Sequence, residues 1–165
     1  MRKKPARLSA LLGGACLLAG CASGPQTQAL APAGFDRVTV GGELRQRIER
    51  NFDRLETDYY QPDQVYWTEE QSGGWPGDKE GRTILALVLD ARASGRTPLY
   101  LDELIRRLPR ELNAKGYLGS IHEGSADEQQ LSGHGWLLRG LCEYYAWKKD
   151  PQVLEIARGI VDSLF

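Results

Sequence analysis

A histidine between two glycines is the first feature of this 165-residue sequence that suits a chemical role. In LSGHGWLLRG, residues 131–140, His134 lies near the predicted start of an apolar helix, with Ser132 as the predicted N-cap. The positive end of a helix dipole opposes protonation, so we expect a neutral imidazole that donates from one nitrogen and accepts at the other. Gly133 and Gly135 would leave room for a ligand that presents hydroxyl groups. Alternatively, the ring bonds a neighbouring loop carbonyl beneath a closed turn.

The segment SGGWPGDKEGR, residues 72–82, offers a second set of groups for a polar ligand. Trp75, beside glycines and a proline, presents a flat ring on which the apolar C–H face of a sugar stacks. Asp78 and Glu80 accept hydrogen bonds from hydroxyl groups. In the alternative interpretation, Trp75 covers the core and the two carboxylates stabilise the positive end of a helix dipole. The sequence leaves both interpretations open.

Two further stretches hold reactive or polar side chains, although a structural role is expected for both. GYLGS, residues 116–120, predicts a tight turn in which glycines adopt unusual backbone angles and Tyr117 and Leu118 point to apolar surroundings. IHEGSADEQQ, residues 121–130, would line a polar cleft with two pairs, His122–Glu123 and Asp127–Glu128. Carboxylates of this kind act as acid and base in glycoside hydrolysis, but acidic residues are far more often simply exposed.

The cysteines and histidines offer neither a disulfide nor a metal cluster. Cys16 falls in a predicted leader and Cys21 at its end, which leaves Cys142 as the one candidate free thiol. Structural zinc takes four Cys or His ligands, and Cys142 with His122 and His134 does not supply them. Cys142 shares a helical stripe with leucines, so we expect it to pack in the core as a small apolar side chain.

The first residues are typical of a bacterial lipoprotein signal peptide. Residues 1–20 combine a basic start with an apolar run over 8–18, and LAGC at 18–21 resembles a lipobox. Such a run is too short for a bilayer-spanning helix. We therefore expect cleavage before Cys21, lipid attachment at Cys21, and a flexible tether over residues 21–34. The predicted location is the cell envelope, anchored to the outer or cytoplasmic membrane.

The charge of the remaining 145 residues argues against nucleic acid as a partner. The leader holds four of the 21 Lys and Arg and none of the 22 Asp and Glu, so the mature chain carries a net charge of −5. Binding to phosphates needs clustered Lys and Arg, and no basic run follows the leader.

Helical periodicity dominates residues 35–165, which are enough for one domain. Apolar residues recur at steps of three and four over 43–57, 80–94 and 132–149, and again from Pro98 and from Pro151. Pro109 should kink or end the third of these helices. The predicted fold class is therefore all-α.

An internal repeat relates the second and third helices to the fourth and fifth at an offset of 53 residues. Ile84, Leu85, Val88 and Leu89 fall on Leu137, Leu138, Leu141 and Cys142, and Thr97-Pro98 falls on Asp150-Pro151. Repeated helical hairpins form either an open solenoid or a closed α/α toroid. The long links 62–79 and 115–131 favour the toroid, in which such links gather at one mouth around a ligand.

Three segments taken in order resemble glycoside hydrolase family 127, bacterial β-L-arabinofuranosidases and their relatives. They are YWTEEQSGGWPGDKEGR, GYLGS and LSGHGWLLRGLCEYYAWKKDPQVLEIARGIVDSL, and the likeness covers residues 43–165. The resemblance implies that residues 35–165 are helical hairpins of a partial (α/α)6 toroid. It also implies a carbohydrate ligand, contacted by His134 and by Trp75 and Asp78.

The family's catalytic groups have no counterpart in this sequence. By resemblance, its members use a cysteine thiolate held on zinc by further cysteines and a glutamate, with another glutamate as acid/base. Cys142 does not match that site, so we assign neither a catalytic residue nor a cofactor to this chain. Two functions stay open: the opening part of a lipid-anchored glycoside hydrolase, and a non-catalytic carbohydrate-binding or envelope lipoprotein. A partial ring leaves apolar faces uncovered, which makes a homodimer possible.

Overall fold

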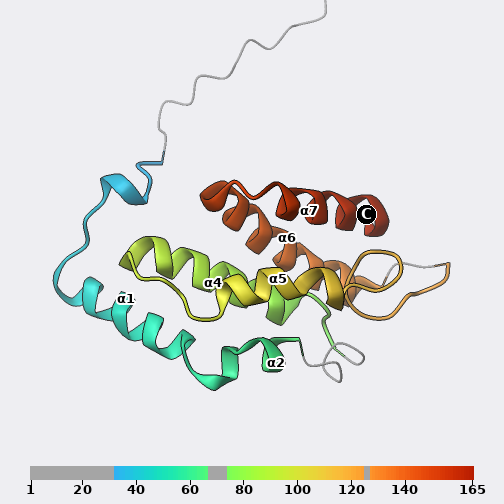
Figure 1. The fold of residues 1–165 in the computed structure, drawn as a ribbon, viewed down its shortest axis with the longest axis horizontal. Coiled ribbons are helices and arrows are strands. Elements are labelled where there is room, and N and C mark those ends of the chain that lie inside the picture. Colours follow the sequence, from blue (N-terminus) through green and yellow to red (C-terminus); the bar gives the residue numbers. More distant parts are fainter. Residues whose placement is uncertain (1–31, 67–73, 125–126) are drawn as a thin grey trace, which may run out of the picture. The chain divides into compact units, whose positions relative to one another are not determined.

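Helices account for every regular element in the part of the chain that the structure, a computed structural model, describes: residues 32–66, 74–124 and 127–165 (Figure 1). The predicted all-α class is confirmed. Residues Ala33–Phe165 form one compact unit. The predicted signal peptide and Cys21 lie outside the described residues, as does most of the predicted tether.

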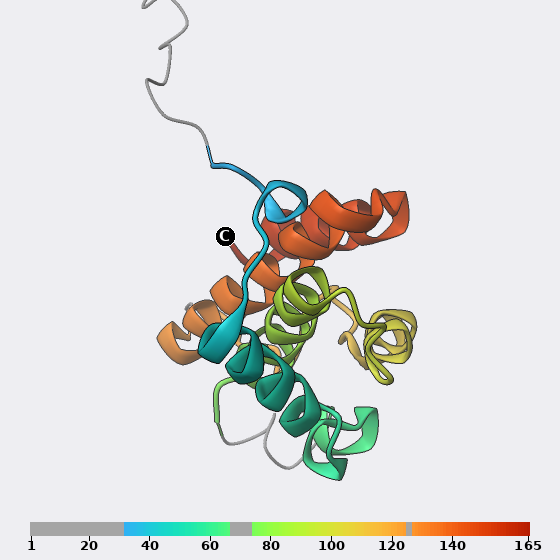
Figure 2. The same cartoon turned by 90° about the vertical axis from the view of Figure 1, so that its left-hand side faces the viewer.

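Two long helices form the centre of this unit. Helix α4 (Asp78–Ser94) packs along α6 (Glu128–Lys148), α1 (Gly42–Leu55) packs on α4, and α7 (Pro151–Leu164) packs on α6. Figures 1 and 2 show α1 and α7 on opposite sides of the α4–α6 pair. The shorter helices α2 (Pro62–Val65) and α5 (Leu101–Glu111) contact α4 and each other. Two 3-10 turns, η1 (Phe35–Arg37) and η2 (Asp58–Tyr60), flank α1.

Glycines allow α4 and α6 to approach closely. A Cβ atom on Gly81 would lie 2.2 Å from the backbone nitrogen of Leu137, and one on Gly140 would lie 2.7 Å from the carbonyl oxygen of Gly81. Neither distance is tolerable for carbon, so only glycine permits this crossing. The backbones themselves form the centre of the interface.

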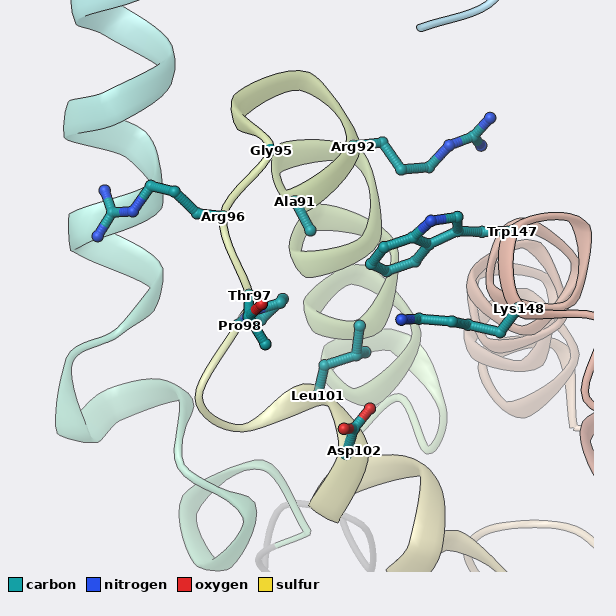
Figure 3. A pocket seen from close by; sticks show the side chains of 10 residues that line it. All are labelled: Ala91, Arg92, Gly95, Arg96, Thr97, Pro98, Leu101, Asp102, Trp147 and Lys148. Carbon is teal, nitrogen blue, oxygen red and sulfur yellow. The ribbon is translucent and has the colours of Figure 1, made fainter. Parts of the chain in front are cut away.

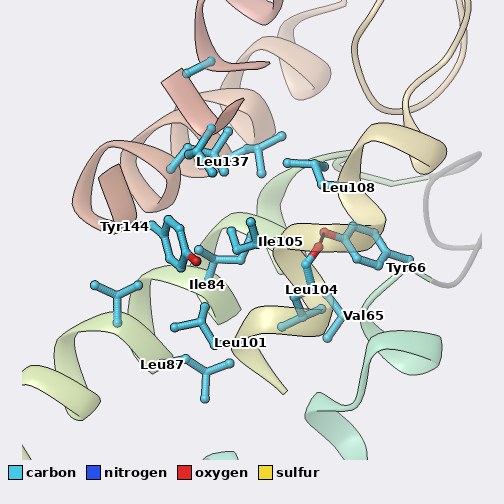
Figure 4. Packing of buried hydrophobic residues seen from close by; sticks show 14 of the residues in the cluster. Val65, Tyr66, Ile84, Leu87, Leu101, Leu104, Ile105, Leu108, Leu137 and Tyr144 are labelled. Atoms are coloured by element: carbon cyan, nitrogen blue, oxygen red, sulfur yellow. Dashed lines mark hydrogen bonds between the residues drawn. The ribbon is translucent and has the colours of Figure 1, made fainter. Parts of the chain in front are cut away.

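Leucine and isoleucine side chains fill the space around that crossing (Figure 4). The cluster takes residues from α1, α2, α4, α5, α6 and α7, and its fully buried members include Ile84, Leu87, Leu104, Leu108, Leu137, Leu141 and Ile160. Tyr66, at the end of α2, is also buried, and its hydroxyl donates to the carbonyl oxygen of Leu104 at 2.8 Å. Burial raises the pKa of that hydroxyl, with a smaller contribution from Glu80. Tyr66 is therefore a neutral donor that ties α2 to α5.

The predicted helices exist, with corrections at two of their starts. The predicted fourth helix begins at Glu128, four residues before Ser132, and its N-cap is Asp127, whose Oδ1 accepts the Gln130 N–H at 2.9 Å. Ser132 is an exposed residue inside the helix, so its predicted capping role is wrong. The predicted third helix begins at Leu101, not at Pro98, and continues two residues past Pro109 to end at Glu111.

The repeat holds for one helix pair and fails at two points. Ile84, Leu85 and Val88 of α4 are buried, and so are Leu137 and Leu141 of α6, as the offset predicts. Asp150 caps α7, because its Oδ1 accepts the Gln152 N–H at 2.9 Å. Thr97 and Pro98 do not cap α5 in the same way, because α5 begins at Leu101 and its N-cap residue is Tyr100. Cys142 is exposed, so its predicted place in the core is wrong.

Within the described residues, no helix combines the length and the apolar character needed to cross a bilayer.

Candidate ligand-binding site

A pocket of about 450 Å³ lies where the end of α1, the turn η2 and the first turns of α4 meet. Its polar and aromatic lining consists of Arg54, Tyr59, Tyr60, Asp78, Lys79 and Arg82, and Leu55, Thr83 and Ala86 complete it. Helix α1 ends at Leu55, and the chain turns there toward α4. The Thr57 hydroxyl, which donates to the Arg54 carbonyl oxygen at 2.9 Å, stabilises this turn. The pocket therefore collects side chains from three separate elements.

Two adjacent tyrosines give the pocket its aromatic surface. The rings of Tyr59 and Tyr60 meet edge to face, with centroids 4.9 Å apart and planes at 84°. Tyr59 is 59% exposed, while Tyr60 is half-buried against the core. The ammonium nitrogen of Lys79 lies 4.7 Å from the centroid of the Tyr59 ring, a cation–π distance. An exposed ring with a polar hydroxyl suits a ligand that has both apolar and hydroxyl faces.

Asp78 is the one predicted site residue that lines this pocket. Its Oδ1 accepts the Nε–H of Arg82 at 2.9 Å, one helical turn along α4. The Arg82 guanidinium also lies 4.3 Å from the centroid of the Trp136 ring on α6, which fixes its orientation. Asp78 keeps the acceptor positions that this bond does not use, so it can accept a hydroxyl hydrogen bond from a ligand.

Trp75 lies on the surface just before α4, and it is 50% exposed. It does not cover the core, so that alternative interpretation of Trp75 is wrong. Its carbonyl oxygen accepts the Asp78 N–H at 2.9 Å, which helps to form the turn that starts α4. The Trp75 ring is available to a ligand, although it is not part of the pocket lining.

Glu80 serves the start of α4. It is 2% exposed, and its Oε2 accepts the Gly77 N–H at 3.0 Å. Gly77 has a φ of 92°, in the left-handed region that favours glycine. Glu80 thus lies in the first turn of α4, at the positive end of the helix dipole, as its alternative interpretation has it, and it also caps the backbone there.

His134 is buried beneath the loop that follows α5. Its exposed fraction is 0%, its Nε2 accepts the Leu118 N–H at 3.0 Å, and its Nδ1 lies 2.8 Å from the Gln130 carbonyl oxygen. Because Nε2 accepts, the proton is assigned to Nδ1, which donates to Gln130. Burial lowers the pKa of the imidazole, so the ring is neutral as predicted, but the cause is desolvation and not the helix dipole.

Neighbouring backbone fills the space that a ligand of His134 would need. A Cβ atom on Gly133 would lie 2.2 Å from the Pro76 carbonyl oxygen, so this glycine accommodates the start of α4 and not a ligand. Tyr117 stands edge-on to the imidazole at 6.0 Å between centroids. Both ring nitrogens bond to the chain beneath a closed turn, so the placement does not support the predicted sugar contact of His134.

GYLGS forms the structural turn that the sequence predicts. Gly116 and Gly119 have φ values of 88° and 84°, and Tyr117 and Leu118 are buried. Residues 121–130 contribute His122 and Asp127 to a second pocket, of about 340 Å³, where His122 Nε2 lies 3.8 Å from Asp127 Oδ2. Glu123 and Glu128 are exposed and do not line it.

A third pocket, of about 270 Å³, lies at the carboxyl end of α4 (Figure 3). Trp147 and Lys148 point toward it from α6, whereas Arg96 points toward α1. Its arginines are already paired: Arg92 with Glu143 at 3.2 Å, and Arg96 with Asp53 at 2.7 Å. Lys148 and Asp102, which also line this pocket, carry one charge of each sign.

Sequence reasoning missed most of the pocket lining. Tyr59 and Tyr60 stand side by side directly after the first predicted helix, and adjacent aromatic residues in a link are the signal that was there to find. Arg54 and Arg82 read as ordinary exposed positions of amphipathic helices. In the three described ranges, no three His, Cys, Asp or Glu side chains are grouped as metal ligands would be.

The described residues thus define an all-helical protein with an aromatic, cationic pocket beside one of its central helices. Comparison of the chain with protein families, with curated proteins and with solved structures gives no match.

Proposed function

We propose that this chain is a lipid-anchored envelope protein that binds carbohydrate at the pocket beside the start of α4. The observation that carries the proposal is the meeting of Asp78 with Tyr59 and Tyr60 around about 450 Å³ of space. Sugars present apolar C–H faces to aromatic rings and hydroxyl groups to carboxylates and guanidinium groups. Trp75 adds an exposed ring three residues before Asp78.

The partial (α/α)6 toroid is part of this proposal. Support comes from the order of the packed helices, since α4 neighbours α1 and α6, and α6 neighbours α7. The two ends of the link from α1 to α4, η2 and the first turn of α4, meet at the pocket. The lipid anchor at Cys21, the tether over 21–34 and a homodimer stay proposals from the sequence.

A glycoside hydrolase is the second candidate, favoured by the order of the three segments that resemble family 127. Its nucleophile, zinc ligands and acid/base are assigned by that resemblance to no residue of this sequence. The pocket residues here supply recognition: an acceptor at Asp78, donors at Arg54 and Arg82, and tyrosine rings. Binding is therefore the function that this chain's own residues support best.

A binding assay with the mature lipoprotein in detergent tests the proposal. Calorimetric titration with a panel of neutral and acidic oligosaccharides should find at least one ligand, and Tyr59→Ala should weaken it about tenfold, as loss of one stacked ring implies. Phe35→Ala is the matched control, because Phe35 is 39% exposed, lies 4.4 Å under the Arg92 guanidinium and is outside the pocket. Equal loss of affinity in both variants, or no binding to any saccharide, would overturn the proposal.

A further inference from the structure

The charges around the pocket are unequal. Three cationic side chains, Arg54, Lys79 and Arg82, line it, against one carboxylate, Asp78. Asp78 is bonded to Arg82, so these two charges offset each other at 2.9 Å. Among the described residues that line the pocket, no other carboxylate stands opposite Arg54, in a mature chain whose net charge is negative.

Arg54 is the cation best placed to meet a ligand. Its guanidinium lies 6.0 Å from the centroid of the Tyr60 ring, and its Nη2 donates to Asn51 Oδ1 at 3.2 Å. Among the described residues the structure gives Arg54 no ion pair with a carboxylate. The side chain is exposed, so a ligand reaches it without displacing protein.

From these observations we propose that the ligand is an acidic saccharide, and that Arg54 binds its carboxylate while a tyrosine ring contacts the same sugar residue. The inference rests on the proposed carbohydrate-binding function and names its substrate class. A guanidinium presents parallel donors that match a carboxylate in a two-point contact, and such bonds are stronger than those between neutral groups. The adjacent Tyr60 ring provides the apolar surface that a uronic acid ring needs beside its charged group.

The negative net charge of the protein means that a preference for acidic saccharides can come only from short-range contacts in the pocket. At a net charge of −5 after the leader, the molecule repels polyanions at long range. Binding of an acidic glycan must then depend on the pocket cations at short range, with an affinity that falls as salt rises.

The test compares galacturonate and glucuronate oligosaccharides with their methyl esters, in which a methyl group replaces the negative charge of each carboxylate. The full mature lipoprotein should bind an acid form at least about tenfold more tightly than its ester, and Arg54→Gln should remove that difference. Arg47→Gln is the control, because Arg47 is an exposed arginine on the same helix that pairs with Glu43 outside the pocket. Arg54→Lys should restore part of the preference, since it keeps the charge but not the planar donors.

The possible results separate this inference from the proposed function. Equal affinity for acid and ester, or a preference that survives Arg54→Gln, overturns the acidic ligand while the carbohydrate-binding function stands. Binding of sulfated but not carboxylated oligosaccharides also overturns it, because the pocket would then recognise a sulfate group and not the planar carboxylate of a uronic acid. Failure to bind any acidic, esterified or neutral saccharide overturns both.

Discussion

Removing the imidazole of His134 should cost the fold about 3 kcal/mol. In His134→Ala, the buried Leu118 N–H loses the acceptor that it has at 3.0 Å, and an unsatisfied buried donor costs about 1–3 kcal/mol. The ring is fully buried, so its loss also leaves a cavity worth roughly 1–2 kcal/mol. Urea unfolding at pH 7.5, followed by circular dichroism, measures the free energy of unfolding of both proteins.

His134→Gln separates the hydrogen bond from the cavity. A glutamine side chain places an amide oxygen near the position of Nε2, so the Leu118 N–H keeps an acceptor. The Gln130 carbonyl lies within α6, where it also has a helical partner. We expect a loss of about 1 kcal/mol, clearly smaller than for alanine. Two results would contradict this reasoning: an equal loss of unfolding free energy in both variants, or a loss below about 1 kcal/mol for His134→Ala. Either would mean that the hydrogen bond from Leu118 to His134 does not stabilise the packing of the loop on α6.

The same pair of proteins should differ in how stability depends on pH. Burial lowers the pKa of His134 from its ordinary value of 6.5, so the unfolded chain takes up this proton before the folded chain does. Stability is therefore lost as pH falls from about 6.5 through the folded-state pKa, with a slope of up to about 1.4 kcal/mol per pH unit. The difference in unfolding free energy between wild type and His134→Gln should shrink over that range. A constant difference from pH 7.5 to pH 5 would refute the buried neutral ring.

The other predictions concern the crossing of the central helices, the caps and the thiol. Gly81→Ala should destabilise the protein by about 2–3 kcal/mol in urea unfolding, because the added Cβ atom would clash with the α6 backbone. Gly135→Ala should stabilise the protein by about 1 kcal/mol, because nothing lies within 4 Å of the added Cβ atom. Asp150→Ala should cost about 1 kcal/mol through loss of the α7 cap, and Thr97→Ala should change stability by less than about 0.5 kcal/mol because α5 begins later. Cys142 should react fully with a thiol reagent in the native protein, without added urea; protection until unfolding would contradict its exposed position.

Helix positions were predictable because their signal is local. Apolar residues three and four apart mark the buried face of α4, where Ile84 and Val88 are buried as expected. The start of α7 was predictable for the same reason, since Asp150 and the following proline form a cap within a few residues. Nothing from distant parts of the chain is needed to read these features.

The buried face of α6 was misread because glycine gives no hydrophobic signal. Leucine, cysteine and tyrosine side chains alone place the centre of the stripe near Leu138 and Cys142. In the structure, Gly133, Gly140 and Tyr144 lie on the buried face, which rotates the interface away from Cys142 and exposes it. This face of α6 is buried because the backbones of α4 and α6 approach closely at their glycines. Such an approach depends on which helix packs against α6. The sequence of one helix does not contain that information.

The candidate pocket depends still more on tertiary structure. Tyr59 and Asp78 are nineteen positions apart, and they meet only because α1 and α4 pack side by side. The sequence pointed to Asp78 through its glycine-rich setting, but the side chains across the pocket belong to helix ends whose mutual distance is set by the fold. Arg54 is indistinguishable by pattern from the other exposed arginines of its helix.

The histidine segment and the tryptophan segment are linked through glycines, although only one of them reaches the pocket. A Cβ atom on Gly77, in the turn before α4, would lie 3.0 Å from the Gly133 carbonyl and 3.1 Å from the His134 nitrogen. The turn that starts α4 therefore contacts the backbone of α6 directly. Asp78 is the first residue of α4, so this contact determines its position. His134 fixes the same stretch of α6 to the GYLGS turn through Leu118. The two segments that first suggested a ligand thus pack on each other: the backbone at Gly133 and His134 contacts the turn before Asp78, while the His134 ring bonds the GYLGS turn.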